Sequence, residues 1–580
     1  MQHPRGWCSC NEIHIGCRSS PGLRSAPHPF PFLDFSQPNS MATNEKEFVG
    51  TRDMHIENMS QSSTHDSVAA EARGGDLSEL PSNYYWNWRF IGSLIAVVFM
   101  AQGLYLGYVL PANTITIINA ELGPDPNYAL IPVVKTLCGG VGLIMVGRLS
   151  DIFGRRCFVL MELVANKHRA VLTGFLFLTT CPLAAFGPLI ARALAAYTTL
   201  GWRWNYYLNL ITNVISVLLF YVCYHPPSHR QLHEGRSMRQ DLKDLDWGGI
   251  VLYSGGLTSF ILALSWGGGL HPWASYHVLV PLILGFFILV AFALYEIYMP
   301  LKYPLIPMNL FLNGPFMALV GVASVASMFY YSLTVIWPQM VTALYESDSI
   351  MIGLVSGTLG GSIAFGQVFG GGSIKLGWGH WQLRASSLAM CGFIGAMAAT
   401  NASTRGLAIT MCALGAFAVG IVEVVGIVAV PFTVAPEDLG LASGLLGSVR
   451  STLGSVATAI FSSILTTQKA KEIPPRLTSL AVQDGLAPAS VKALVKAGLS
   501  GAAATVAKIP GITSERLSAY MTAIRDGNVK SYHMVFYSSL AFGGIAVICA
   551  FYCKEFNSHF TDRVDRKLQQ PKKQETEKQV

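Results

Sequence analysis

The sequence predicts an all-α membrane protein whose chain crosses a lipid bilayer many times. Of the 580 residues, 51% are hydrophobic and 13% are charged, whereas soluble globular domains carry about 25% charged residues. Apolar runs recur along the chain, and each has roughly the 20 residues that an α-helix needs to cross about 30 Å of hydrocarbon. Polar and basic stretches separate these runs. This alternation excludes a soluble globular protein.

The apolar runs define twelve predicted membrane helices. Their length and hydrophobicity set the assignments, and the segments between them are too polar to cross a bilayer. The predicted helices cover residues 90–112, 129–147, 171–191, 206–224, 248–266, 276–298, 315–337, 350–372, 385–400, 406–430, 441–466 and 532–553.

The two ends of the chain differ from this membrane domain, which spans residues 86–555. Residues 1–85 are rich in Pro, Ser, His and charged residues and lack helical periodicity, so we expect a disordered cytosolic tail. At Met41 the sequence reads "MATNEKEF", which is typical of the start of a polar cytosolic tail and indicates that translation begins there. We therefore expect residues 1–40 to be an extension introduced by the gene prediction. Residues 556–580 form a basic cytosolic tail.

Lysine and arginine are concentrated in the loops on one side of the predicted helices. The loops 267–275 and 338–349 on the opposite side contain neither residue. Because cytosolic loops carry an excess of positive charge, the basic side is cytosolic and both termini lie there. Loop 467–531 is also basic but falls outside, since segments of this length are translocated regardless of their charge. Within it, "SVKALVKAGLS" predicts a short surface helix.

No cofactor, metal or nucleic-acid partner is expected. The net charge of +7 is spread over short loops and the C-terminal tail. The chain has no glycine-rich phosphate-binding loop of the P-loop type, so ATP is not expected to drive it. Its eleven cysteines include none in the long outer loop, which argues against a disulfide framework.

The segment "GRLSDIFGRR", which begins at Gly147, directly follows an apolar run. Gly147 permits close helix packing and Gly154 permits a tight turn, because glycine has no side chain. Asp151 is expected at a helix N-terminus, where a carboxylate meets free N–H groups and the positive end of the helix dipole. Arg155 and Arg156 are expected to pair with acids on neighbouring helices and to hold the cytosolic side closed.

This pattern, G-x-L-x-D-x-x-G-R-R, resembles the signature loop between the second and third helices of the major facilitator superfamily. Four further segments begin at Leu110, Gly201, Asp246 and Pro436. They read "LPANTITIINAELGPDPN", "GWRWNYYLNL", "DWGGIVLYSGGLTSFILALSWGG" and "PEDLGLASGLLGSVRSTLGSVATAIF". These segments are similar to the fungal trichothecene-efflux-pump-like group, which is allied to siderophore-iron transporters and belongs to the 14-spanner drug:proton antiporter branch. The similarity covers residues 80–555.

The resemblance implies the major facilitator fold and a proton-coupled secondary transporter rather than an enzyme. It implies a small-molecule substrate bound between two helical halves. The proton gradient takes the place of a cofactor as the energy source, and the protein is expected to be a monomer in the lipid bilayer of the plasma membrane. Export of a hydrophobic toxin, drug or secondary metabolite is the favoured function. Uptake of an Fe(III)–siderophore is the alternative.

Two helices of the family pattern are missing between Arg156 and Glu162. In the resembling family, "GRLSDIFGRR" precedes the third helix, and a segment like "ELVANKHRA" follows the fourth. Here five residues separate the two segments, about 8 Å as a helix at roughly 1.5 Å per residue, which is far short of one crossing. We interpret the chain as a 14-spanner without helices 3 and 4, joined at Leu160–Met161 by a skipped exon. A transport-inactive isoform is therefore a third alternative.

Glu423 and Arg450 are ionisable residues that lie within predicted spans, near the cytosolic half. Ionisable groups inside a membrane are costly and are candidates for function. Glu423 has apolar neighbours for several residues on each side, so it is a candidate for proton coupling, with a purely structural acid as the alternative. Arg450, one helix later, is its expected partner. A Glu423–Arg450 pair is expected to act as a gate that breaks during the conformational change.

Several other residues in the spans are candidates for lining a central cavity or shaping a helix. Asn113 and Thr114 lie where the antiporter branch resembles "D-x-T-I-V-N", so the acidic position is an amide here and cannot titrate. Gln367, in "AFGQVFGGG", is a third candidate for the cavity. Gly187 and Pro188 resemble the Gly-Pro core of the antiporter motif, and a generic helix kink is the alternative.

Two residues near the outer face complete the set. Lys135 lies near the outer end of the second span and is expected to extend its amine to the membrane surface. Asn401 opens the sequon Asn401-Ala402-Ser403 on the predicted outer side. It is therefore a candidate glycosylation site.

Overall fold

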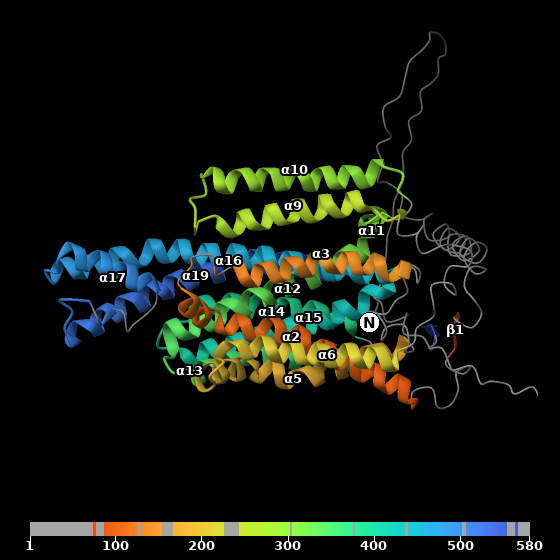
Figure 1. Ribbon diagram of the computed structural model, residues 1–580, viewed down its shortest axis with the longest axis horizontal. Helices are drawn as coiled ribbons and strands as arrows, with labels where there is room; N and C mark the ends of the chain where they lie inside the picture. Colours follow the sequence, from red (N-terminus) through yellow and green to blue (C-terminus); the bar gives the residue numbers. More distant parts are fainter. Residues whose placement is uncertain are drawn as a thin grey trace, which may run out of the picture. The chain divides into compact units, whose positions relative to one another are not determined.

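The computed structural model describes fourteen stretches or single residues of the chain. They are 73–76, 86–123, 125, 128, 130–153, 166–224, 243–268, 270–301, 304–374, 378–434, 439–500, 506–507, 509–553 and 563–566. Twelve long helices within them overlap the twelve predicted membrane segments (Figure 1). These helices are α2 (Trp88–Leu122), α3 (Leu130–Phe153), α5 (Asn166–Tyr197), α6 (Trp204–Cys223), α9 (Trp247–Trp266), α10 (Tyr276–Tyr298), α12 (Gly314–Met340), α13 (Ser349–Ser373), α14 (Gly379–Ala396), α15 (Arg405–Ala429), α16 (Leu439–Gln483) and α19 (Ser514–Tyr552).

Ten helices in the described ranges are long and apolar enough to cross a membrane. The helices α14 and α16 fall short of that apolarity, because their sequences hold more polar and small residues. Even so, α14 packs against α15 and α19, while α16 packs against α3, α12 and α19. The protein is thus an all-α polytopic membrane protein, as the sequence predicts.

Short elements connect the long helices. They are η4 (Gly201–Arg203), α11 (Asn309–Leu312), η5 (Val341–Tyr345), η7 (Met397–Ala399), η8 (Val430–Thr433) and α17 (Pro488–Ser500). Five of them have three to five residues, and α17 has 13.

Two short strands lie in the predicted tails, and one of them falls in the N-terminal tail that was expected to be disordered. The strand β1 (Arg73–Asp76) pairs antiparallel with β2 (Arg563–Arg566), and Gly75 lies opposite Val564. The expectation of disorder is wrong at Arg73–Asp76, because backbone hydrogen bonds between segments far apart in sequence leave no mark on local composition. The rest of the two predicted tails, including the proposed extension 1–40, lies outside the described residues.

Six helices, α12 to α16 and α19, pack around one another. The helices α12 and α15 are buried along most of their length. Both are apolar on every side, which is the composition of a helix that other helices surround. A second group is formed by α2, α5 and α6. The two groups meet mainly where α5 runs along α13, and α3 packs on the first group along α16 (Figure 1).

Glycines bring α5 and α13 into backbone contact. A Cβ atom at Gly357 would lie 2.0 Å from the carbonyl oxygen of Ala185, and one at Gly360 would lie 2.2 Å from that of Ala184. Pro188 has no N–H, so the carbonyl of Ala184 lacks its usual helical donor. The absent side chain at Gly360 leaves room for this oxygen. Pro188 on α5 and the glycines on α13 therefore form one fitted interface.

The outer loop predicted at 467–531 is largely a helical unit. The helix α16 continues to Gln483, α17 follows, and α19 begins at Ser514. "SVKALVKAGLS" lies in α17, so the predicted surface helix is confirmed. Figure 1 shows α17 beside the ends of α16 and α19, beyond the ends of the other helices. A separate apolar core joins the three, with its largest buried side chains at Ile473, Leu477, Leu494, Ile509, Tyr520 and Ile524.

Candidate functional site

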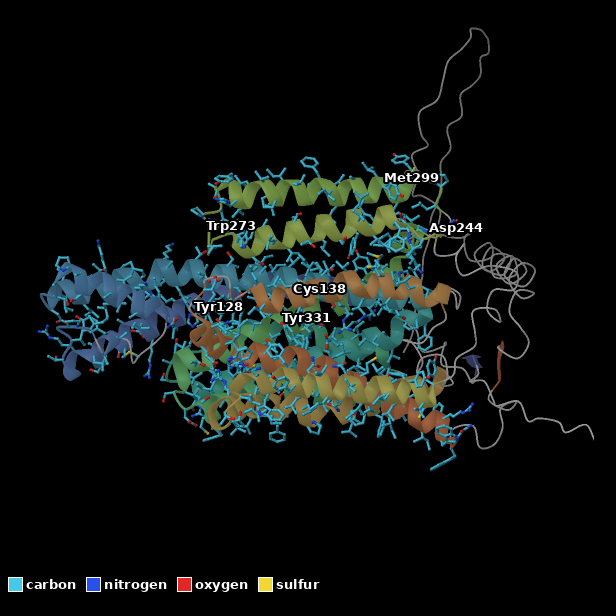
Figure 2. All side chains as sticks on the ribbon, in the orientation of Figure 1. Tyr128, Cys138, Asp244, Trp273, Met299 and Tyr331 are labelled. Atoms are coloured by element: carbon cyan, nitrogen blue, oxygen red, sulfur yellow. The ribbon has the colours of Figure 1, made fainter. Side chains whose placement is uncertain are left out.

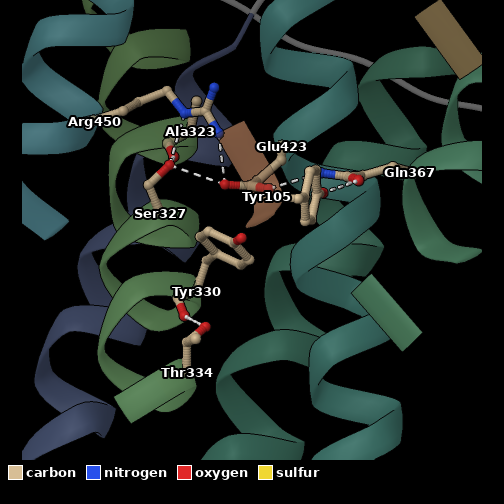
Figure 3. A network of polar contacts seen from close by, with 8 residues as sticks. All are labelled: Tyr105, Ala323, Ser327, Tyr330, Thr334, Gln367, Glu423 and Arg450. Atoms are coloured by element: carbon tan, nitrogen blue, oxygen red, sulfur yellow. Dashed lines mark hydrogen bonds and ion pairs between the residues drawn. The ribbon is translucent and has the colours of Figure 1, made fainter. Parts of the chain in front are cut away.

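Glu423 on α15 and Arg450 on α16 form a buried ion pair. The Nη2 atom of Arg450 lies 2.6 Å from Oε1 of Glu423. The side chain of Glu423 is 3% exposed and that of Arg450 is 19% exposed. Away from water such a pair is little screened, and each charge depends on the other for compensation. The sequence analysis paired these two residues, and Figure 3 shows them in contact.

Two more side chains complete the hydrogen bonding of the Glu423 carboxylate. Ser327 on α12 donates to Oε1 at 3.0 Å and accepts from Nε of Arg450 at 2.6 Å. Gln367 on α13 donates from Nε2 to Oε2 at 3.0 Å. Both carboxylate oxygens are therefore engaged. Four helices, α12, α13, α15 and α16, meet at this one carboxylate (Figure 3).

Close packing of α13 on α15 places Gln367 beside Glu423. A Cβ atom at Gly366 would lie 2.1 Å from a backbone carbonyl oxygen of α15. A Cβ atom at Gly420 would lie 2.1 Å from the carbonyl oxygen of Ile363. The two backbones touch because glycine has no side chain at these positions. The amide of Gln367 then reaches the carboxylate directly.

Four tyrosines connect this network to α2. Tyr105 donates its hydroxyl to Oε1 of Gln367 at 3.1 Å, and Tyr108 donates to the carbonyl oxygen of Tyr331 at 3.0 Å. Tyr330 and Tyr331 on α12 lie against the two α2 rings, and the ring centroids of the contacting pairs are 4.9 to 6.5 Å apart. Figure 2 shows Tyr331 within the body of the bundle. The tyrosines thus bring α2 into contact with the helices that hold Glu423.

Sequence reasoning missed Ser327 and the four tyrosines. A serine or tyrosine in an apolar run is common in membrane helices, so nothing in the local pattern separates these five. The one available signal is the double tyrosine in "ASMFYYSLTV", which puts two hydroxyl groups in the middle of a span. That signal gives no partner, because the partners depend on how α2 and α12 are rotated against each other.

The Glu423 carboxylate joins the charge on α16 to hydrogen bonds from α12 and α13. The carboxylate is the counter-charge of Arg450 and accepts from Ser327 and Gln367. A proton on Glu423 would remove that counter-charge and turn one acceptor oxygen into a donor. Since four helices meet here, one proton changes the attraction between them.

A sequence model of the fungal trichothecene efflux pump family matches residues 51–174 and 160–580. The chain belongs to the fungal trichothecene efflux pump family. It is therefore a multi-pass membrane transporter of the major facilitator type.

Two named transporters and one solved structure are similar to most of the chain. The trichothecene efflux pump TRI12 of Fusarium sporotrichioides is 28% identical over 88% of this chain and 93% of its own. The MFS-type transporter prx5 of Penicillium rubens is 30% identical over 72% of this chain and 76% of its own. A solved bacterial homologue of the human lysosomal transporter Spinster, inward-facing and occupied, is 14% identical over 83% of this chain and 99% of its own, with a TM-score of 0.41.

The signature motif that begins at Gly147 lies at the end of α3. Gly147 is buried, and a Cβ atom there would lie 3.1 Å from Cα of Gly444 on α16, so the expected close approach is present. Asp151 lies in the last turn of α3. The expectation that it begins a helix is wrong, because α3 runs on through the motif to Phe153.

The rest of this motif falls outside the described residues. Gly154, Arg155 and Arg156 belong to residues 154–165, and so does the junction at Leu160–Met161. The gate and the missing pair of helices therefore stay predictions.

Asn113 and Thr114 lie in the buried part of α2, apart from the Glu423 network. Asn113 donates to the carbonyl oxygen of Val109 in its own helix at 2.8 Å. Thr114 accepts from Nδ2 of Asn205 on α6 at 3.0 Å. Of the three predicted cavity residues, the structure thus brings only Gln367 to the buried acid.

The remaining predicted positions lie at helix contacts and at the outer face. Gly187 and Pro188 lie inside α5, where a Cβ atom at Gly187 would meet a Leu110 methyl group of α2 at 3.2 Å. Asn401 is exposed between η7 and α15, and its backbone N–H donates to Oγ1 of Thr404 at 2.7 Å. No group of three or more potential metal-binding side chains occurs within the described ranges.

Proposed function

We propose that this chain exports a hydrophobic toxin or secondary metabolite in exchange for protons. The observation that carries the proposal is the Glu423 carboxylate, buried at a point where four helices meet and paired with Arg450. Ionisable groups held inside a membrane bundle mark proton relays and substrate pathways. The named relatives are a trichothecene efflux pump and an MFS-type transporter, and this favours export over siderophore uptake.

The exchange follows from the two charge states of Glu423. With Glu423 ionised, the pair with Arg450 draws α15 and α16 together. Protonation breaks this attraction, so the helices around it can rearrange and open the other side. The substrate and the proton then act at different times on the same two-state element, the helices around the Glu423–Arg450 pair. This is the condition for coupling their movements.

The proposal includes the orientation of the chain in the membrane, its location, its oligomeric state and its partners. We propose that both termini lie in the cytosol, which the basic loops support, and that the substrate enters from that side. We propose the plasma membrane as the location, a monomer as the working unit, and a small molecule and the surrounding lipid as its partners. The helical unit of α16, α17 and α19 then lies outside the cell.

Transport in inside-out membrane vesicles tests this proposal. Vesicles from yeast that express the full chain receive a pH gradient, acidic inside, and a radiolabelled panel with one trichothecene and one hydrophobic carboxylic acid. We expect accumulation several-fold above that in vector-only vesicles, lost when a protonophore collapses the gradient. Accumulation that ignores the gradient would contradict proton exchange. Uptake of a ferric siderophore by right-side-out vesicles would instead support import.

We also propose that two helices of the family are absent between α3 and α5. The alignment with the Fusarium pump covers 563 residues. The 88% of this 580-residue chain within it is about 510 residues, so the relative has about 50 that this chain lacks. Two spans of roughly 20 residues with their connections need that many. The two family matches also overlap at residues 160–174, next to the junction.

The genomic sequence between the codons of Leu160 and Met161 checks this second proposal. We expect an in-frame segment of about 50 codons that encodes two apolar runs of roughly 20 residues each. Uninterrupted coding sequence at this point in the gene would contradict it.

A further inference from the structure

Lys135 places a positive charge against the middle of α2. It lies on α3, and its Nζ atom donates to the carbonyl oxygen of Leu104 at 3.5 Å. The same atom is 5.0 Å from the ring centroid of Tyr108. Leu104 is near the midpoint of α2 (Trp88–Leu122), so the amine lies level with the middle of that helix. The expectation that Lys135 extends to the membrane surface is therefore wrong.

This charge has no acidic partner in the part of the chain that the structure describes. Glu423, the acid of the buried network, is already paired with Arg450. Arg192 on α5 is buried as well, and its Nε atom has no hydrogen-bond partner among the described residues. Within the described ranges, no acidic side chain therefore offsets the charge of Lys135 directly. An ammonium group in a membrane span needs a counter-charge or strong acceptors.

The tyrosines beside Lys135 supply an apolar wall and a free donor. The Tyr108 ring that faces the amine is also 6.4 Å, centroid to centroid, from the ring of Tyr330. Tyr330 is half-buried, and within the described ranges its hydroxyl has no hydrogen-bond partner, unlike those of Tyr105 and Tyr108 (Figure 3). Lys135 itself is exposed along its side chain. A cation, a free hydroxyl and aromatic faces therefore lie around one ring.

We propose that Lys135 and Tyr330 form a substrate subsite that selects hydrophobic compounds carrying an anionic oxygen, such as a carboxylic acid. The anionic oxygen accepts from Nζ of Lys135 and supplies its missing counter-charge. The apolar body of the compound packs on the rings of Tyr330 and Tyr331, which are only partly buried. The proposal rests on the proposed function in one respect, since it takes the interior of the bundle as the substrate route.

Binding of a matched acid and ester to the full chain tests this subsite. The chain is placed in nanodiscs of neutral phosphatidylcholine at pH 8, and 1-pyrenebutyric acid and its methyl ester are titrated by fluorescence. We expect the acid to bind about tenfold more tightly than the ester, because charge-assisted hydrogen bonds are roughly twice as strong as neutral ones. K135M should remove the preference, and K135R should retain it.

A second lysine gives the control. Lys469 on α16 also lies over a tyrosine ring, 5.3 Å from the centroid of Tyr532, so K469M should keep the full preference for the acid. Equal binding of acid and ester by the unaltered chain, binding of neither compound, or an unchanged preference in K135M would overturn the subsite. The readout needs no gradient. A preference for the acid without gradient-driven transport would keep the subsite and reject proton exchange.

Discussion

Glu423→Gln is expected to abolish proton-driven export and to spare substrate exchange across the membrane. Glutamine has the shape of the protonated acid and keeps acceptors for Ser327 and Arg450, but it cannot release a proton. The variant should therefore bind and carry substrate without coupling it to the gradient. Removing one partner of a buried ion pair costs about 3–5 kcal/mol, so the melting temperature should fall as well.

Two vesicle assays separate this coupling role from a structural one. Gradient-driven accumulation should drop to background in Glu423→Gln, while counterflow between labelled and unlabelled substrate should stay near that of the unaltered chain. A parallel loss of both activities would show that Glu423 only supports the fold. Glu121 provides the matched control, because its pair with Arg203 is exposed, with 2.8 Å between Oε1 and Nη1. Glu121→Gln should leave both activities unchanged.

The double variant Glu423→Gln/Arg450→Gln checks the energy of the pair. Because it removes both charges, neither is left buried without compensation, and stability should recover relative to either single variant. Transport coupling should stay absent. If the double variant is as unstable as the sum of the single variants, the two residues do not stabilise each other.

The Glu423–Arg450 contact could be predicted from the sequence for a physical reason. Ionisable groups are rare in these spans, and two opposite charges one helix apart have few other partners in an apolar bundle. The interior position of Gln367 could be predicted as well, since an amide in a span also needs hydrogen bonds. The sequence could not show that Gln367 bonds Glu423 itself, because that depends on how closely the glycines of α13 let it approach α15.

The helix ends were harder to predict than the helices. The span predicted at 441–466 continues as α16 to Gln483, with Pro474 and Pro475 inside it. Proline removes a backbone donor and usually ends a helix, and the residues after 466 are polar. Packing against α17 and α19 holds these turns in place. The apolar residues of the core shared by the three helices do not repeat over a stretch long enough to be recognised in the sequence.

Lys135 shows how the same physics gives opposite results in different surroundings. From the sequence, a lysine near the outer end of a span extends to water. In the structure its amine finds the Leu104 carbonyl and the Tyr108 ring on the neighbouring helix instead. Whether the amine reaches water or the neighbouring helix depends on the distance between α2 and α3. The sequence of neither helix determines that distance alone.

Gly357→Ala is expected to weaken the contact between α5 and α13 and to lower both stability and transport. The added Cβ atom would lie 2.0 Å from the carbonyl oxygen of Ala185, which is backbone and cannot rotate away. The two helices must therefore separate. Overpacking of this kind costs about 1–3 kcal/mol. Because α5 and α13 join the two groups of helices, a shift here also disturbs the movement that transport requires.

Gly372, on the same helix, supplies the control. A Cβ atom at Gly372 meets no atom within 4 Å, and alanine is a better helix former than glycine by about 0.8–1.0 kcal/mol. Gly372→Ala should therefore keep or slightly raise the melting temperature and leave transport unchanged. Thermal unfolding of the two purified variants and accumulation in vesicles measure both effects. Equal behaviour of the two variants would mean that α5 and α13 are not in backbone contact in the membrane.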